Sequence, residues 1–323
     1  MQFRRILLIF SFFIVNFLFA NEFVLSQQKI ETAKYQATLS YKIAQNSQKA
    51  VLYIHGFNDY FFNKMFAKEF YDNGYSFFAL DLHNYGRNLT PTSKPYYFTH
   101  IEEFDDEITQ TIELMKEKFA IEDITLYGYS QGGLISALYA NKYGNVNRLI
   151  LDSPFLDFNF NAFLENIALP VVAKLGQFFP TFKIESNEPN IFGQSLHKDF
   201  YGEWDFDTHL KSTQTNAPIY LGWINAIYQA QKKIHKGIDI NLPILCLYSS
   251  MSQPSSSEKK FHHSSDIVLS VKDIKKYSQN LNKNKKLTQH VEIKNAMHGV
   301  IFSQKDVRNE AYKIIFNWLN SKS

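Results

Sequence analysis

Cysteine is almost absent from this sequence, which has only Cys246 among its 323 residues. A single thiol cannot form an intramolecular disulfide, so the fold must be held together by its core in any redox compartment. Cys246 lies in the largely apolar run 242–248, a pattern typical of a buried strand. We therefore interpret it as a core residue and not as a reactive thiol.

Strong charge of one sign is also lacking. The formal net charge is +3, and it falls to +1 without residues 1–20, which contain Arg4 and Arg5 but no acidic residue. Domains that bind nucleic acids usually concentrate much more positive charge than this. We therefore expect no nucleic-acid partner.

Motifs for metals and phosphates are missing from the sequence. There is no paired Cys and His spacing of the kind that binds zinc, and no glycine-rich phosphate loop. His262-His263 is a lone doublet, which we interpret as solvated. The residues themselves thus offer no recognisable metal or phosphate site.

A membrane-spanning run of about 20 apolar residues is not evident either. The nearly apolar stretch 6–20 has 15 residues, follows Arg4 and Arg5, and ends where Asn21-Glu22 turn polar. This layout is typical of a secretory signal peptide with Ala20 as the last residue removed. The alternative is an uncleaved N-terminal anchor, and in both cases we expect an exported protein, periplasmic or secreted.

Apolar and aromatic residues are abundant, with 45% apolar residues overall and 30 Phe, so the chain can bury a large core. Short apolar runs alternate with helix-length amphipathic segments. The runs are 50–54, 75–80, 124–127, 149–151, 244–247 and 290–293, and the helical segments include 64–73, 101–119 and 132–143. Runs that are apolar throughout indicate strands covered on both faces. The sequence predicts an α/β fold with a doubly wound, mostly parallel sheet.

The alternation fails between residues 153 and 240, a separation far longer than one crossover between strands requires. We interpret 153–240 as an inserted, mainly helical cap on a core formed by 21–152 and 241–323. A serine-rich patch at 252–257 is typical of an exposed loop, and its role stays open.

The segment Gly128-Tyr-Ser-Gln-Gly-Gly133 lies between a predicted strand and a predicted helix. This is the context of the G-x-S-x-G nucleophile elbow, in which a serine oxygen projects from a sharp turn. A serine hydroxyl is a poor nucleophile at neutral pH and needs a base, which in turn needs an orienting acid. We predict Ser130 as the nucleophile.

His298 is the candidate base, because it follows the last predicted strand and precedes a helix expected to start near Lys305. The acid is expected after the strand that ends near residues 248–250. Asp266 is favoured because the apolar residues that follow it would anchor it, and Glu258 and Asp273 are its competitors. Asp152, after the preceding strand, is the reserve candidate, although an Asp before Ser-Pro is more often a turn residue.

Acyl transfer also needs donors aimed at the developing oxyanion. We predict the backbone N–H groups of Gln131, next to the nucleophile, and of Phe57 in the segment His55-Gly-Phe-Asn-Asp59. Because these are main-chain roles, the identity of the two side chains matters little. His55 itself is interpreted as a structural residue.

Five segments together resemble the family of α/β-hydrolases that includes monoacylglycerol lipases and lysophospholipases, often labelled by the serine aminopeptidase domain name. They are His55-Gly-Phe-Asn-Asp, Asp81-Leu-His-Asn-Tyr-Gly-Arg87, the serine elbow, Ser264-Ser-Asp-Ile-Val-Leu and Ala296-Met-His-Gly. The resemblance implies the α/β-hydrolase fold, a triad of Ser130, Asp266 and His298, and no cofactor. The chain departs from the family pattern at two places: His83-Asn84 stands where many relatives have Arg-Gly, and the acid loop is lengthened. Both departures bear more on which substrate can be inferred from the family than on the triad.

The cap begins with an aromatic segment at 155–163 and stays apolar through 179. Such a surface suits an acyl chain, although a cap must also pack a core of its own. Phe155, Trp204 and Trp223 are candidate substrate contacts, with a structural role as the alternative.

The sequence predicts a serine hydrolase of carboxylic esters that acts through an acyl-enzyme. A lipid-like ester such as a monoacylglycerol or lysophospholipid is the expected substrate, and contact with a membrane surface is an open expectation. One alternative is an aminopeptidase, for which Glu203, Asp205 and Asp207 are the only acidic cluster that could hold a substrate ammonium. The other is a non-catalytic binding protein on the same scaffold.

Overall fold

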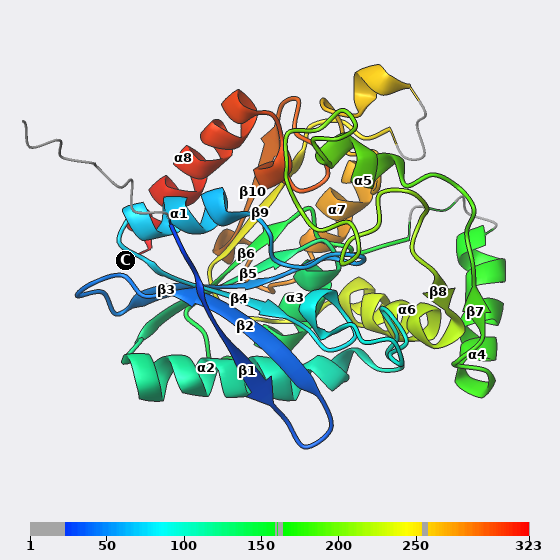
Figure 1. Cartoon of the computed structure of the whole chain (residues 1–323), viewed down its shortest axis with the longest axis horizontal. Helices are drawn as coiled ribbons and strands as arrows, with labels where there is room; N and C mark the ends of the chain where they lie inside the picture. Colours follow the sequence, from blue (N-terminus) through cyan, green and yellow to red (C-terminus); the bar gives the residue numbers. More distant parts are fainter. Residues whose placement is uncertain (1–22, 159, 161–163, 254–257, 323) are drawn as a thin grey trace, which may run out of the picture.

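One eight-stranded sheet forms the centre of the protein. The computed structural model describes residues 23–158, 160, 164–253 and 258–322. The sheet order is β1-β2-β4-β3-β5-β6-β9-β10 (Figure 1). The strands are β1 (Ser26–Glu31), β2 (Gln36–Lys42), β3 (Lys49–Ile54), β4 (Ser76–Asp81), β5 (Asp123–Tyr129), β6 (Arg148–Asp152), β9 (Ile244–Ser249) and β10 (Thr288–Ile293). Within this sheet only the β1–β2 and β2–β4 pairs are antiparallel, which confirms the predicted mostly parallel sheet.

The six apolar runs of the sequence form β3, β4, β5, β6, β9 and β10. The first five of these strands are buried along almost their whole length, as expected when helices cover both faces of a sheet. β1 and β2 were not among the predicted apolar runs. β1 is an edge strand whose side chains are mostly exposed, so it lacks the continuous apolar run of a central strand.

Helices pack on both faces of the sheet, which confirms the doubly wound arrangement. The helices α1 (Lys64–Asp72) and α8 (Lys305–Ser321) lie on one face, and α2 (Asp105–Phe119), α3 (Gln131–Tyr143) and α7 (Val271–Ser278) lie on the other (Figure 1). The chain also forms short helical turns: η1 (Gly86–Asn88), η2 (Ile101–Phe104), η3 (Leu164–Ala168), η4 (Lys259–Phe261), η5 (Lys285–Leu287) and η6 (Val300–Phe302).

An insertion separates the neighbouring strands β6 and β9. It contains α4 (Leu169–Phe178), α5 (Ile191–Leu196), α6 (Leu221–Lys236) and the antiparallel pair β7 (Lys183–Ile184) and β8 (Ile219–Tyr220). Figure 1 shows α4, β7 and β8 together at one end of the molecule. The predicted cap, 153–240, includes α6. That helix packs against α4 and also against α3 and α7 of the core, so it also serves as the crossover helix between two parallel strands.

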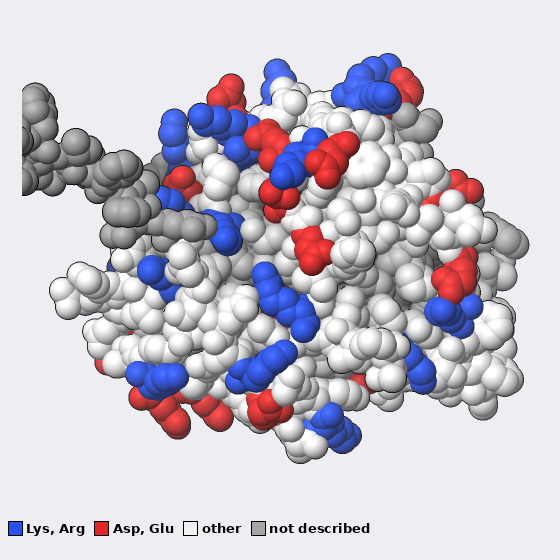
Figure 2. Space-filling model, viewed as in Figure 1, with Lys and Arg blue, Asp and Glu red and all other residues white. Residues whose placement is uncertain are grey.

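Charged side chains of both signs are interspersed on the face shown in Figure 2. Within the described part of the chain, no helix combines the length and the apolar character needed to cross a bilayer. The predicted signal segment, 1–20, lies outside the described residues.

Candidate active site

Ser130 occupies the sharp turn between β5 and α3. Its backbone has φ 52° and ψ −118°, a strained conformation of the kind that functional sites retain. The elbow also passes very close to the end of β3. A Cβ atom on Gly132 would lie 2.3 Å from the carbonyl oxygen of Ile54 and 2.4 Å from that of His55, so only glycine fits there. The glycine pattern of the motif is therefore explained by backbone contact.

Ser130, His298 and Asp266 form a chain of two hydrogen bonds. The hydroxyl of Ser130 and Nε2 of His298 are 2.9 Å apart, and Nδ1 of His298 lies 2.9 Å from Oδ2 of Asp266. All three residues are buried. Because a carboxylate can only accept, Nδ1 carries the proton and Nε2 of the neutral ring accepts from the serine. This arrangement can remove the serine proton as the oxygen attacks an electrophile.

Asp266 is held by the loop that follows β9. Its Oδ1 accepts the backbone N–H groups of Val268 at 2.9 Å and Leu269 at 2.7 Å. Its own N–H donates to the carbonyl of Met251 at 2.9 Å. The apolar residues after Asp266 thus supply the backbone donors that orient the carboxylate, leaving Oδ2 for the histidine.

Asp152, the reserve candidate, does not reach the ring of His298 but holds the segment after it. Its carboxylate accepts the backbone N–H of Val300 at 2.8 Å and the hydroxyl of Tyr127 at 2.9 Å. Its main-chain carbonyl accepts the N–H of Ser130 at 2.9 Å. Burial raises the pKa of Asp152 above its usual range, although these donors oppose the shift. The structure therefore brings Asp266, and not Asp152, to the histidine.

The two predicted oxyanion donors belong to segments that flank Ser130. Gln131 is the first residue of α3, where a backbone N–H has no partner within the helix. Phe57 lies in the loop after β3, and that loop runs close to the serine: a Cβ on Gly56 would be 3.1 Å from Cβ of Ser130. As expected, His55 is structural, since its Nε2 accepts the N–H of Leu82 at 3.1 Å.

A cavity of about 370 Å³ opens onto Ser130 and His298. Most of its wall comes from the cap, from β7, α5 and the segments around them. Its apolar lining is Phe57, Tyr129, Ile184, Phe192, Ala217, Ile219 and Val268, and its polar lining is Asn58, Ser186, Asn190, Lys211 and Asn216. No carboxylate is among these described lining residues. A larger hollow of about 450 Å³ beside η2, α4 and α6 shares no lining residue with it.

The three aromatic residues predicted as substrate contacts do not line this cavity. The indole N–H of Trp204 donates to the carbonyl of Phe302 at 2.9 Å, and that of Trp223 donates to the side chain of Gln131 at 2.8 Å. Phe155 packs against Phe158 and Trp223. Trp204 and Trp223 thus bond the cap to the core, whereas the rings in contact with Phe155 both belong to the cap.

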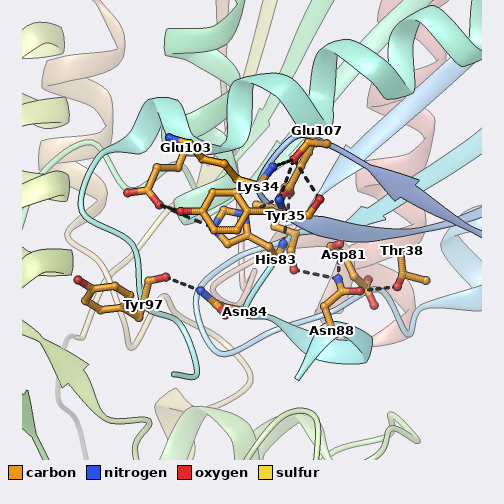
Figure 3. Close-up of polar contacts among 12 residues, drawn as sticks. Lys34, Tyr35, Thr38, Asp81, His83, Asn84, Asn88, Tyr97, Glu103 and Glu107 are labelled. Carbon is orange, nitrogen blue, oxygen red and sulfur yellow. Dashed lines mark hydrogen bonds and ion pairs between the residues drawn. The ribbon is translucent and has the colours of Figure 1, made fainter. Parts of the chain in front are cut away.

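The Asp81 loop, which departs from the family pattern, is bonded to neighbouring segments of the core (Figure 3). Nδ1 of His83 bonds the carboxylate of Glu107, and the His83 ring stacks on Tyr35 with centroids 3.7 Å apart. The amide of Asn84 donates to the carbonyl of Tyr97 at 2.8 Å. Neither His83 nor Asn84 lines the cavity, so the departure from the family pattern does not change the wall of that cavity.

No group of three or more His, Cys, Asp or Glu suited to a metal ion occurs within the described ranges. The interpretation of His262-His263 as solvated is wrong for His262, which is 3% exposed. Its neighbour His263 bonds the carbonyl of Ser195 at 3.0 Å. The doublet is packed against the cap.

The chain also matches a known protein family. A family model described as serine aminopeptidase, S33 (Hydrolase_4) matches residues 45–301, which is more than half of the chain. The chain belongs to this family. The predicted resemblance to α/β-hydrolases of the monoacylglycerol lipase and lysophospholipase type is confirmed.

Individual relatives are similar over most of their length. A protein of Haemophilus influenzae named "Probable lysophospholipase L2" is 24% identical over 278 residues, covering 80% of this chain and 79% of that protein. Among solved structures, a soluble variant of monoglyceride lipase from Saccharomyces cerevisiae has a TM-score of 0.69 at 15% identity and covers 93% of this chain and 97% of that one. A Paleococcus ferrophilus monoacylglycerol lipase has a TM-score of 0.64 at 18% identity, with 93% and 99% covered. These structures share the α/β-hydrolase fold, which confirms the predicted fold class.

Proposed function

We propose that this member of the family is a serine esterase that cleaves lipid-like carboxylic esters through an acyl-enzyme. The observation that carries the proposal is the bonded chain of Ser130, His298 and Asp266 beside a largely apolar cavity. Family membership supports a hydrolase of the esterase or lipase type. The serine mechanism and the lipid substrate are the parts that need testing.

In the proposed reaction the oxygen of Ser130 attacks the ester carbonyl while Nε2 of His298 takes the serine proton. The N–H groups of Phe57 and Gln131 would stabilise the oxyanion of the tetrahedral intermediate. His298 then gives its proton to the departing alcohol, leaving the acyl group on Ser130. A water molecule, deprotonated by His298, attacks the acyl-enzyme, and the carboxylic acid leaves as the serine regains its proton.

The cavity favours an apolar acyl group. Seven of its lining residues are apolar or aromatic, and each buried methylene of a substrate contributes about 0.8 kcal/mol to binding. Its volume of about 370 Å³ lies at the lower end of the range of small-molecule sites, roughly 300–1,000 Å³. A single acyl chain on a small head group fits this description better than a bulky substrate.

The aminopeptidase alternative is less well supported, because it requires a carboxylate to bind the substrate ammonium. None of the three acidic residues of the candidate cluster lines the cavity. Glu203 pairs with Arg308 at 3.0 Å, and Asp205 pairs with Lys198 at 2.7 Å at the surface. The charged side chain that does line the cavity is Lys211, whose amine has no acceptor to offer an ammonium group.

We further propose that the protein is exported and that its cap contacts a lipid surface. Exposed apolar residues follow the helical turn η3 and α4 at spacings of three or four; they are Leu164, Ile167, Val171, Leu175 and Phe178. Ile184 is 44% exposed and also lines the cavity, so the exposed apolar surface reaches the site. Binding to phosphatidylcholine vesicles that Phe178→Ser weakens would support this contact, and unchanged binding would contradict it.

The direct test is turnover of p-nitrophenyl esters from acetate to palmitate by the protein and by Ser130→Ala. By analogy with a serine protease, the substitution should lower kcat by on the order of 10⁶. A rate that peaks at eight or more carbons and disappears in the variant supports a lipid esterase. Activity confined to acetate indicates a small-substrate esterase. No turnover, together with no labelling of Ser130 by a fluorophosphonate, would favour the non-catalytic binding protein.

A further inference from the structure

The loop that carries Phe57 is held from the cap as well as from the core. It leaves β3 at Ile54 and has no regular secondary structure, and Asn58 within it has a positive φ of 49°. On the core side, Oδ1 of Asn58 accepts the hydroxyl of Tyr96 at 2.8 Å. The remaining contacts described below come from cap residues about 150 positions later in the sequence.

One of the cap contacts is a buried ion pair. Nζ of Lys211 lies 2.9 Å from Oδ1 of Asp59 and 3.4 Å from the carbonyl of Asn58. Lys211 is 3% exposed and Asp59 is fully buried. The second oxygen of Asp59 receives no hydrogen bond from any residue that the structure describes. The carboxylate at the end of this loop therefore depends on Lys211.

Two neighbouring contacts fix the same stretch of loop. The N–H of Ser212 donates to Oδ1 of Asn58 at 3.3 Å, and the hydroxyl of Tyr60 accepts the N–H of Asp207 at 2.8 Å. Residues 58, 59 and 60 are thus each bonded to the cap segment 207–212. Lys211 and Asn58 also line the cavity that holds Ser130, so this connection lies in the wall of the site itself.

We infer that Lys211 is a positioning residue for the oxyanion donor, through which the cap holds the Phe57 N–H in place. This inference rests on the proposed esterase function. Phe57 is two residues from Asp59, so a shift of the Asp59 end of the loop would move its N–H relative to the carbonyl carbon attacked by Ser130. A misplacement of about 1 Å can cost about 10²-fold in rate, and the loss of one oxyanion donor costs about 10²–10³-fold.

The test compares Lys211→Met, the double variant Lys211→Met/Asp59→Asn, and the control Lys198→Met. The control removes an exposed lysine of the same cap, paired with Asp205 at 2.7 Å. We measure kcat and KM with a p-nitrophenyl ester and inhibition by a trifluoromethyl ketone, whose tetrahedral adduct needs the oxyanion donors. Inhibition by the corresponding unfluorinated methyl ketone, which is uncharged and forms no stable adduct, reports ordinary binding.

We expect Lys211→Met to lower kcat by about 10- to 100-fold and to weaken the trifluoromethyl ketone in parallel, with KM and methyl-ketone inhibition unchanged. The double variant removes both buried charges, so it should fold even where the single variant does not, and its kcat should remain low. Lys198→Met should match the wild type.

Three results would overturn the inference: wild-type kcat in Lys211→Met, equal weakening of both inhibitors, or recovery of kcat in the double variant. Failure of the proposed function is a different result, because the wild-type protein itself would then show no turnover and no phosphonate label on Ser130.

Discussion

The assignment of the acid can be tested by comparing Asp266→Asn with Asp152→Asn. Both carboxylates are buried near the same histidine segment, but only Asp266 reaches the ring, at 2.9 Å from Nδ1. In Asp266→Asn the amide oxygen can keep the backbone donors of Val268 and Leu269. The amide nitrogen then faces Nδ1, which must accept, so the ring proton moves to Nε2. That ring cannot take the proton of Ser130.

The expected loss is about 10⁴-fold in kcat, by analogy with the same substitution in a serine protease. This corresponds to about 5.5 kcal/mol of transition-state free energy at 1.36 kcal/mol for each factor of ten. Folding should be little affected, because the two backbone hydrogen bonds of Oδ1 survive. The assay is ester turnover at saturating substrate, with the melting temperature measured on the same samples.

Asp152→Asn is the matched control. Its amide oxygen can still accept the N–H of Val300, and its amide nitrogen can donate to the hydroxyl of Tyr127. We expect kcat to stay within about tenfold of the wild type, with a stability loss of about 1–3 kcal/mol for the disturbed hydrogen bonds. The reasoning is refuted if Asp266→Asn keeps more than about a tenth of wild-type kcat, or if Asp152→Asn costs the more of the two.

Three further predictions concern packing and titration. Gly132→Ala should prevent folding, because its Cβ would lie 2.3 Å from a backbone oxygen. In Gly144→Ala the new Cβ meets no atom within 4 Å, so the free energy of unfolding should fall by only about 1 kcal/mol. Soluble yield and thermal melting distinguish the two variants. Burial raises the pKa of Asp157 to about 7, whereas the same carboxyl ionises near pH 4 in the unfolded chain. The contribution of Asp157 to stability is therefore lost as the pH rises from about 4 to about 7. Asp157→Asn should therefore raise the melting temperature at pH 8 and leave it unchanged at pH 4, and an equal shift at both would contradict this. Burial also raises the pKa of Cys246 to about 12, so Ellman's reagent at pH 8 should react with one thiol in guanidinium and with none in the native protein.

The central strands and the serine elbow could be predicted because their signals are local. A strand covered on both faces must be apolar along its whole length, and β3 to β6 show this in the sequence. The glycines beside Ser130 are required by the approach of the β3 backbone. β1 could not be identified in this way, because an exposed edge strand has the composition of a loop.

Some residues of the candidate site likewise have a local signal in the sequence, and others do not. Ser130 and His298 are marked by the turns in which they occur, whereas the acid was one of several carboxylates until the fold brought Asp266 to Nδ1. The aromatic residues of the cap were evident in the sequence, but the direction of their side chains was not. Trp204 and Trp223 are turned into the packing.

The sequence by itself therefore determined the six parallel strands, the serine elbow and the turn that carries His298, because each depends on a short apolar run or on a turn only a few residues long. The tertiary structure alone decided which carboxylate meets His298 and which cap residues form the wall of the cavity. Ile184, Phe192 and Lys211 reach Ser130 only through contacts between segments distant in sequence. Such contacts are set by how the cap packs on the core, and no local pattern of residues records them.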